Sequence, residues 1–321
     1  MRKLNKRFKT GLIIMLILLT GGCAVSPKVE FIRNDKKIDV MIDGEHLTSC
    51  VYSDEAAKPI LYPLNSPSGL RLNRGYPIVR IEGETTDHPH HAGLFFTYDK
   101  VNGEGFWANL NVPPQVKHIK VTQCRGGKGK GTITTTAQWV GKSGQVLLNE
   151  KRQMVFIAGK DEYAIDFTFD LTAPKDTKVV FEDTKEGMFA IRVADWLREK
   201  GGTGRYLSSN GDETEKNIWG KRAEWVRLEG QKDDKTVGIA IFNHPSSVNF
   251  PTYWHVRAYG LFSANPLGQY DFEKVRNPDT AQHFNLTLEP GQNAHFRFRM
   301  LVYEGTRTKE QLQKTFEKFA Q

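Results

Sequence analysis

The segment from Asp87 to Leu94 concentrates side chains that can do chemistry. Three of the nine histidines occur within four positions, at His88, His90 and His91. An imidazole can transfer protons near neutral pH and can bind a metal ion. Pro89 is unsuited to a central strand, so the segment is predicted to be a loop or a sheet edge. We expect His90 to be a catalytic acid and His88 and His91 to bind substrate. A polar loop whose histidines cap backbone groups is the alternative.

A second group of polar side chains follows Phe250-Pro251. In an extended chain Tyr253, His255 and Arg257 share one face, and Thr252, Trp254 and Val256 share the other. A hydroxyl, an imidazole and a guanidinium in one row can bind a polyol or a carboxylate. His255 is a candidate acid, and Tyr253 and Arg257 are candidate substrate-binding residues, as are the nearby Asn243 and His244. A solvated strand face is the alternative.

A third candidate pair lies in the segment from Lys185 to Arg192. As a strand, this segment places Glu186 and Arg192 on one face and Phe189, Ile191 and Val193 on the other. Glu186 is a candidate general base, with Arg192 as its partner or as an anion clamp. A cross-strand ion pair would explain the same residues. We predict that this pair, the row at Tyr253 and the histidine loop converge at one mouth of the fold, because ligand sites gather a few polar groups in a concave pocket.

The elements that position these residues are predicted to be strands. Apolar and polar residues alternate in 163–171 and again in 295–303, which is the period of a half-buried strand. Ile38, Val40 and Ile42 alternate before a hairpin-type turn at Asp43-Gly44. The sequence predicts an all-β fold, a single large antiparallel β supersandwich over residues 37–321. A short C-terminal helix is predicted from the capping pair Thr308 and Gln311, followed by Leu312, Phe316 and Phe319 at helical spacing.

The N-terminal segment resembles an export signal. Residues 1–22 hold five basic residues and no acid. The basic residues come first, and the apolar run of eight residues at 12–19 that follows them is too short to span a bilayer. Gly21-Gly22-Cys23 resembles the lipobox of bacterial lipoproteins. We expect a lipid on Cys23, a tether over 23–36 and a protein in the cell envelope. Ala24 after the cysteine suggests the outer membrane, facing the periplasm.

Charge and cysteine content limit the partners. Without the leader the chain has 40 basic and 37 acidic residues, a net charge of +3. Nucleic-acid binding needs a dense basic stripe, so no nucleic-acid partner is expected. Cys50 and Cys124 could form a disulfide or remain two separate thiols, and the sequence leaves both open. We predict no cofactor, although a metal at His88, His90 and His91 is an alternative.

Several of these motifs together resemble the bacterial family known as methane oxygenase PmoA-like. The resemblance covers most of residues 40–305 and rests on Asp87-His88-Pro89-His90-His91, Glu186-Gly187-Met188, residues 205–211, Trp219-Gly220-Lys221-Arg222 and residues 251–257. One departure is Ala92, where that family usually has Arg. By analogy, an exported β sandwich with His, Glu and Arg on one face is similar to galactose mutarotase-like proteins.

Three functions are compatible with these observations. The first is an enzyme that acts on a carbohydrate or sugar acid by acid–base chemistry, through epimerisation, elimination or hydrolysis; Glu186 favours it. The second is a lipoprotein that binds a glycan without turnover, which the loss of Arg at Ala92 favours. The third is an oxygenase, as the family name implies, and it would require a redox metal.

Overall fold

Alternating side chains create the centre of the larger antiparallel sheet. β10 (Glu162–Thr172) pairs with β19 (Asn293–Glu304), so that Phe167 lies opposite Phe298 and Phe169 opposite Phe296. All four rings are buried. On the other face Arg299 donates to both carboxylate oxygens of Asp166, at 2.5 and 2.7 Å. The structure, a computed structural model, describes residues 26–53, 57–110 and 112–321.

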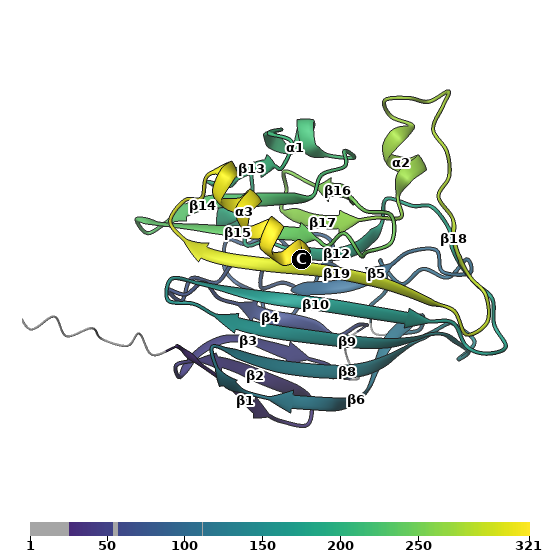
Figure 1. The fold of residues 1–321 in the computed structure, drawn as a ribbon, viewed down its shortest axis with the longest axis horizontal. Helices are drawn as coiled ribbons and strands as arrows, with labels where there is room; N and C mark the ends of the chain where they lie inside the picture. The colour runs from purple at the N-terminus through teal and green to yellow at the C-terminus, as the bar shows by residue number, and fades with distance from the viewer. Residues whose placement is uncertain (1–25, 54–56, 111) are drawn as a thin grey trace, which may run out of the picture.

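Two large sheets form the fold (Figure 1). The nine-stranded sheet has the order β16 (Tyr253–Val256), β17 (Leu261–Asn265), β12 (Gly187–Arg192), β5 (Leu94–Tyr98), β4 (Ile60–Leu64), β3 (Glu45–Val51), β2 (Lys37–Ile42), β1 (Lys28–Arg33) and β7 (Gly127–Lys128). The eight-stranded sheet has the order β13 (Arg205–Ser208), β14 (Trp225–Lys232), β15 (Lys235–Asn243), β19, β10, β9 (Val146–Ala158), β8 (Lys130–Val140) and β6 (Gln115–Arg125). A small pair, β11 (Val179–Phe181) with β18 (Leu286–Leu288), completes the strands of the described residues.

The main core lies between the two large sheets. Phe96 of β5 stacks on Phe169 of β10 with ring centroids 3.7 Å apart, and Phe189 of β12 stacks on Phe298 of β19 at 4.9 Å. These contacts join the two sheets face to face, with aromatic rings from both. The predicted antiparallel all-β sandwich is therefore confirmed.

Helices are few among the described residues, and the longest covers the outer face of the eight-stranded sheet. α3 (Lys309–Ala320) begins at the predicted capping box, in which Thr308 and Gln311 bond each other's backbone N–H groups. Its buried Leu312, Phe316 and Phe319 pack in a cluster with residues of β14, β15 and β19. The other helices are α1 (Thr214–Ile218), α2 (Gln269–Glu273) and the 3₁₀ turn η1 (Asp195–Leu197).

Some expectations for the N-terminal part differ from the structure or lie outside it. Residues 28–33 were expected in a tether, but they form β1, which pairs with β2 and β7 because Val29 inserts into the core. Cys23 and the expected signal, residues 1–22, lie outside the described residues. Both described cysteines are free thiols, and burial raises the pKa of Cys50 to about 11. Among the described residues, no helix has the length and apolar character needed to cross a bilayer.

Candidate functional site

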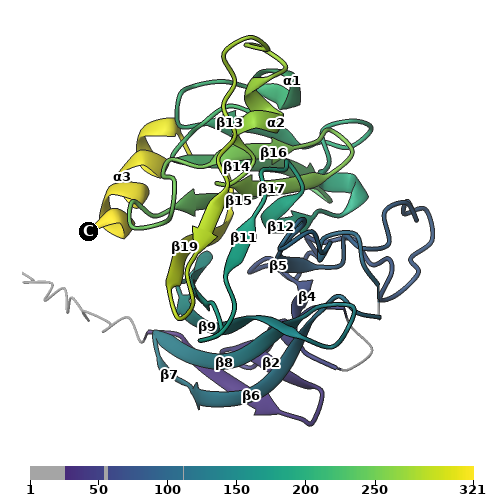
Figure 2. The ribbon, with the colours of Figure 1, turned by 90° about the vertical axis from the view of Figure 1, so that its right-hand side faces the viewer.

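The candidate site lies on the face of the nine-stranded sheet that points away from the main core. The strand register places one residue of each neighbouring strand in a row across this face: His255, Ser263, Ala190, Phe95, Ile60 and Val51. With strands ~4.8 Å apart, the row from His255 to Ile60 spans about 19 Å. Phe95, Ala190 and Ile60 form a second apolar cluster there with Trp107 and Leu261. The long connection between β4 and β5 lies beside these strands (Figure 2).

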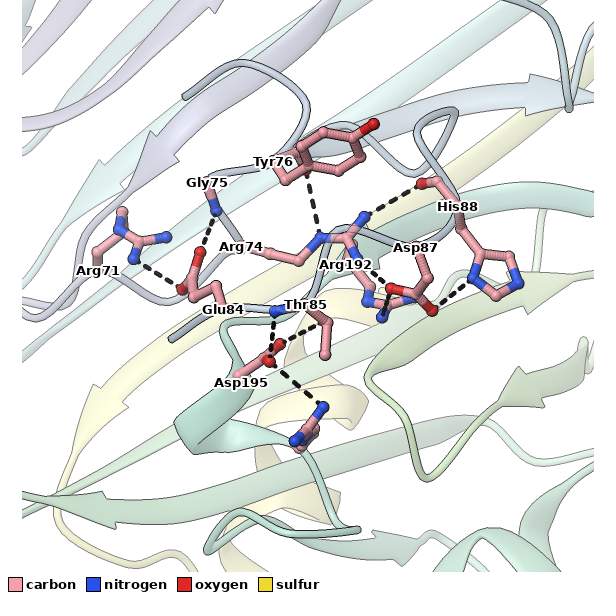
Figure 3. Close-up of polar contacts among 11 residues, drawn as sticks. Arg71, Arg74, Gly75, Tyr76, Glu84, Thr85, Asp87, His88, Arg192 and Asp195 are labelled. Atoms are coloured by element: carbon pink, nitrogen blue, oxygen red, sulfur yellow. Dashed lines mark hydrogen bonds and ion pairs between the residues drawn. The ribbon is translucent and has the colours of Figure 1, made fainter. Parts of the chain in front are cut away.

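Asp87 fixes the start of the histidine loop to the sheet (Figure 3). Its Oδ1 accepts hydrogen bonds from Nη1 of Arg74 at 2.5 Å and Nη2 of Arg192 at 2.7 Å. Its Oδ2 lies 2.6 Å from Nδ1 of His88. Both guanidinium groups are fully buried. Partial burial acts to raise the pKa of Asp87, but Arg192, His88 and Arg74 outweigh it and hold this pKa well below its usual range. The carboxylate is therefore ionised at neutral pH.

Two further carboxylates hold the rest of this connection. Glu84 accepts from Nη2 of Arg71 at 2.8 Å and from the backbone N–H of Gly75 at 2.7 Å. Asp195 accepts from the backbone N–H and the hydroxyl of Thr85, at 2.8 and 3.0 Å. The loop before His88 is thus pinned at both ends of the 75–85 turn, which preorganises the histidines that follow (Figure 3).

The rings of His88 and His91 take part in a stack. His88 lies between Tyr259 and His91, with ring centroids 5.0 Å apart on each side and the planes within 9° of parallel. His91 is 2% exposed, neither ring nitrogen has a hydrogen-bond partner, and burial holds its pKa far below the usual value. His91 is therefore a neutral packing ring whose nitrogens are covered. This placement argues against the predicted substrate-binding role of His91.

The three histidine rings do not share one orientation. His90 meets His91 edge to face at 4.3 Å, whereas His88 and His91 are stacked. Among the described residues, no group of three or more His, Cys, Asp or Glu side chains has the arrangement of a metal site.

Glu186 acts electrostatically on two imidazoles from different segments. Burial lowers the pKa of His90 to about 4, with Lys58 and His88 adding to the effect and Glu186 opposing it. Burial also lowers the pKa of His255 to about 4, and Glu186 again opposes the shift. Glu186 precedes β12, is partly exposed and pairs with Lys185 at 2.8 Å. The predicted trio of His90, Glu186 and His255 therefore shares one electrostatic environment.

The tautomer of His255 follows from its hydrogen bond. Nδ1 lies 2.9 Å from the backbone oxygen of Lys185, and a carbonyl can only accept, so Nδ1 carries the proton. In the neutral ring, Nε2 then holds the lone pair, and the hydrogen bond that this ring makes within the described residues is through Nδ1. The rings of Trp219 and Phe272 meet the His255 ring edge to face, with ring centroids 6.4 and 5.9 Å from its centroid, and so fix its plane.

Arg192 and Glu186 are not partners. Sequence reasoning paired them, but Arg192 bonds Asp87 while Glu186 pairs with Lys185. The guanidinium of Arg192 also lies 4.6 Å from the ring centre of Tyr259, and its Nε and Nη1 atoms are buried without partners. Arg192 thus holds Asp87 at the start of the histidine loop and contacts Tyr259 in the stack of rings.

Tyr253 and Arg257 lie near His255 but have other contacts. Tyr253 shares the face of His255, where both pack on Phe272. Its hydroxyl donates to Glu273, and its ring lies 4.3 Å from the guanidinium of Arg222. Arg257 follows the end of β16, pairs with Glu215 at 3.4 Å and lies 5.8 Å from the ring centre of Tyr259. Arg257 is the more accessible of the two.

Asn243 and His244 lie apart from this group. Asn243 ends β15 in the other sheet, and its amide oxygen accepts from the backbone N–H of Thr252. His244 contacts Arg297 at 2.9 Å and the ring of Phe319 in α3. Their predicted substrate-binding role is not supported, because Asn243 holds the backbone of Thr252 and His244 packs against α3 on the outer face of the other sheet. The prediction rested on their closeness to Phe250 along the chain.

Lys58 is a site residue that the sequence reasoning missed. It precedes β4, is 3% exposed and lines a pocket of about 410 Å³ together with His90. Burial lowers its pKa to about 7. In the sequence, the burial of Lys58 is indicated by its place two positions before an apolar strand, which is a weak signal.

Comparison with known proteins gives a family without a known activity. Residues 37–317 match the model of the family of unknown function DUF6807. The chain belongs to this family. The resemblance to the methane oxygenase PmoA-like family is therefore wrong, because no such family matches. Ala92 then no longer favours glycan binding without turnover, since that inference depended on the Arg usual in that family. No curated protein matches.

Solved structures with a similar fold include sugar-related proteins at low similarity. A GH36 α-galactosidase from Geobacillus stearothermophilus is 9% identical with a TM-score of 0.46, over 86% of this chain and 41% of the other. Galactose mutarotase-like proteins from Lactobacillus casei and Clostridium acetobutylicum are 11% and 8% identical, with TM-scores of 0.40 and 0.37. The matches cover 86% and 88% of this chain and 100% and 99% of the others. The chain thus spans about two fifths of the α-galactosidase. Similarity at this level assigns no activity.

Proposed function

We propose that this DUF6807 protein is an enzyme that acts on a carbohydrate by acid–base chemistry on the outer face of the nine-stranded sheet. The observation that carries the proposal is the hydrogen bond between Nδ1 of His255 and the backbone oxygen of Lys185, which places this imidazole beside Glu186. The Glu186 carboxylate opposes the lowering of the pKa of both His90 and His255. Titratable groups with shifted pKa values that share one face are typical of catalytic sites.

The two imidazoles enter the reaction as proton acceptors. With a pKa of about 4, His255 is neutral at pH 7 and offers the lone pair of Nε2. It takes a proton from the substrate, and Glu186 stabilises the imidazolium that forms. The imidazolium then returns the proton as an acid. This order refines the expectation of Glu186 as base and His90 or His255 as acid, because a histidine must gain its proton before it can donate it.

A hydroxyl-rich ligand suits the remaining groups. Nε2 of His255 and the Glu186 carboxylate accept hydrogen bonds, while the accessible Arg257 donates them. Trp219, whose ring fixes His255, adds an aromatic surface at the same place. Sugars present many hydroxyl groups on a compact ring and can satisfy acceptors and donors together.

The proposal is tested by turnover of a sugar panel. The protein is incubated with neutral and acidic mono- and oligosaccharides in D₂O, and proton NMR follows epimerisation, elimination or hydrolysis. Glu186→Gln and His255→Gln should each lower turnover by about 100- to 10,000-fold. His295→Gln is the control, because His295 pairs with Asp170 in the other sheet. Turnover that these two variants leave intact overturns the proposal, and binding without any turnover favours a glycan-binding protein.

The expected location also remains a proposal. A lipid on Cys23 would place the protein in the bacterial envelope, facing the periplasm. Cys23→Ala should then release it from the membrane fraction, and a variant that stays membrane-bound would contradict the anchor.

A further inference from the structure

A pocket with one buried cation lies at the β4 end of the row, and it shares His90 with the proposed catalytic groups. It measures about 410 Å³, and its floor includes Val51 and Ile60 from the same row across the sheet as His255. Pro89 and His90 form part of its wall. His90 therefore belongs both to this pocket and to the electrostatic environment of Glu186.

Lys58 is the one lysine or arginine that lines this pocket among the described residues. Its Nζ donates to the backbone oxygen of Trp107 at 3.1 Å and lies 5.0 Å from the ring centre of Phe95. An ammonium group has three donors, so the Trp107 carbonyl satisfies a third of them. Within the described residues, no carboxylate forms an ion pair with Lys58.

Two acids near this pocket, Asp87 and Glu186, are already engaged by other cations. Arg74 and Arg192, both buried, share the single carboxylate of Asp87. Glu186 is engaged by Lys185. A buried cation without a counter-charge is costly, and an anion in the pocket would supply that charge. Because the described residues that line the pocket include one cationic side chain, the pocket suits a ligand that carries one negative charge.

We propose that this pocket binds the carboxylate of an acidic sugar, with Lys58 as its counter-ion, so that the substrate is a uronic acid or a related sugar acid. This inference rests on the proposed function and narrows its substrate class. The carboxylate sits against Lys58 and the apolar floor, and the ring extends past His90 towards Glu186. The lowered pKa of Lys58 agrees with a site that becomes fully charged when the anion arrives, because a nearby negative charge favours the protonated amine.

Calorimetric titration with matched ligands tests the assignment. D-glucuronate, D-glucose and acetate are each titrated into the full-length protein at pH 6.5. The wild type should bind glucuronate about 10- to 100-fold more tightly than glucose, since charge-assisted hydrogen bonds contribute this much. Lys58→Met should remove the preference, and Lys58→Arg should retain part of it. Lys175→Met is the control, because Lys175 is exposed beyond β10. Circular dichroism shows whether each variant folds.

The outcomes separate this inference from the proposed function. Equal binding of glucuronate and glucose by the wild type, or a preference that survives Lys58→Met, overturns the Lys58 site and leaves the acid–base proposal standing. Glucuronate binding that depends on Lys58, without turnover that depends on Glu186, supports the site and overturns the enzyme. Binding of acetate as tight as glucuronate shows an anion site that does not recognise a sugar. If none of the three ligands binds, the Lys58 site is overturned, and turnover of the wider sugar panel still decides the proposed function.

Discussion

Nη2 of Arg192 lies 2.7 Å from Oδ1 of Asp87, although the two residues are 105 positions apart in the chain. The bond ties the histidine loop to the centre of the nine-stranded sheet. The same oxygen also accepts from Arg74, so one carboxylate compensates two buried guanidinium groups.

Asp87→Asn should destabilise the fold more than the loss of an ordinary surface ion pair. The amide leaves two fully buried cations without a counter-charge, which we expect to lower the free energy of unfolding by up to about 3 kcal/mol. Urea denaturation measures this change. Asp170→Asn is the matched control, because the partly exposed pair of Asp170 with His295 should contribute less than about 1 kcal/mol. Equal effects of the two variants would show that Asp87 is not a structural anchor.

The stability of the protein should fall as the pH falls from 6.5 towards 4. The pKa of His255 is about 4 in the folded state against a usual value of 6.5, so in this range the unfolded chain binds a proton that the native state does not. Full stability is present above pH 6.5. Each such group changes the free energy of unfolding by about 1.4 kcal/mol per pH unit within the window.

The contribution of His255 can be isolated by substitution. His255→Gln removes one titrating group. The slope of the unfolding free energy against pH should therefore decrease by the contribution of about one proton, which is about 1.4 kcal/mol per pH unit. Phe272→Leu is the control: Phe272 packs on the same ring but does not titrate, so this variant should lower stability at every pH and leave the slope unchanged. An unaltered slope in His255→Gln would contradict the neutral, buried imidazole.

The cap of α3 should contribute measurably to stability. Thr308→Ala removes the side-chain acceptor for the backbone N–H of Gln311 and should cost about 1 kcal/mol in thermal or urea unfolding. Thr315→Ala on the same helix is the control, because alanine has the higher helix propensity and the change should be neutral or stabilising. A cost as large at Thr315 as at Thr308 would contradict the capping role.

Local pattern explains what could be predicted from the sequence. The strands and α3 follow from alternation at Phe296–Val302 and from the spacing after Thr308, because each pattern needs only neighbouring residues. The row of Tyr253 and His255 on one face, opposite Trp254, follows in the same way and is confirmed, since Trp254 lies in the main core. The face that carries the candidate site was therefore accessible to sequence reasoning.

Partners that are distant in the chain explain what could not be predicted. Arg192 was matched with Glu186 because the two are six positions apart on one strand, whereas its carboxylate is supplied by Asp87. Lys58 is buried by Trp107, 49 positions away, and by Phe95, so nothing adjacent to it marks its burial. Such pairings depend on the order of strands in the sheet, which no local pattern specifies.

Binding of glucuronate should depend on pH through Lys58. In the free protein the pKa of Lys58 is about 7, so at pH 6 most molecules carry the ammonium and at pH 8 most carry the neutral amine. Binding of the anion above pH 7 therefore requires uptake of a proton, and the affinity should fall by up to about tenfold per pH unit there. Lys58→Arg keeps its charge across this range and should bind glucuronate with a flat pH profile. Calorimetry in buffers of different ionisation enthalpy measures the proton uptake directly. A wild-type affinity that is constant from pH 6 to 8.5, with no proton taken up, would show that the carboxylate is not bound by Lys58.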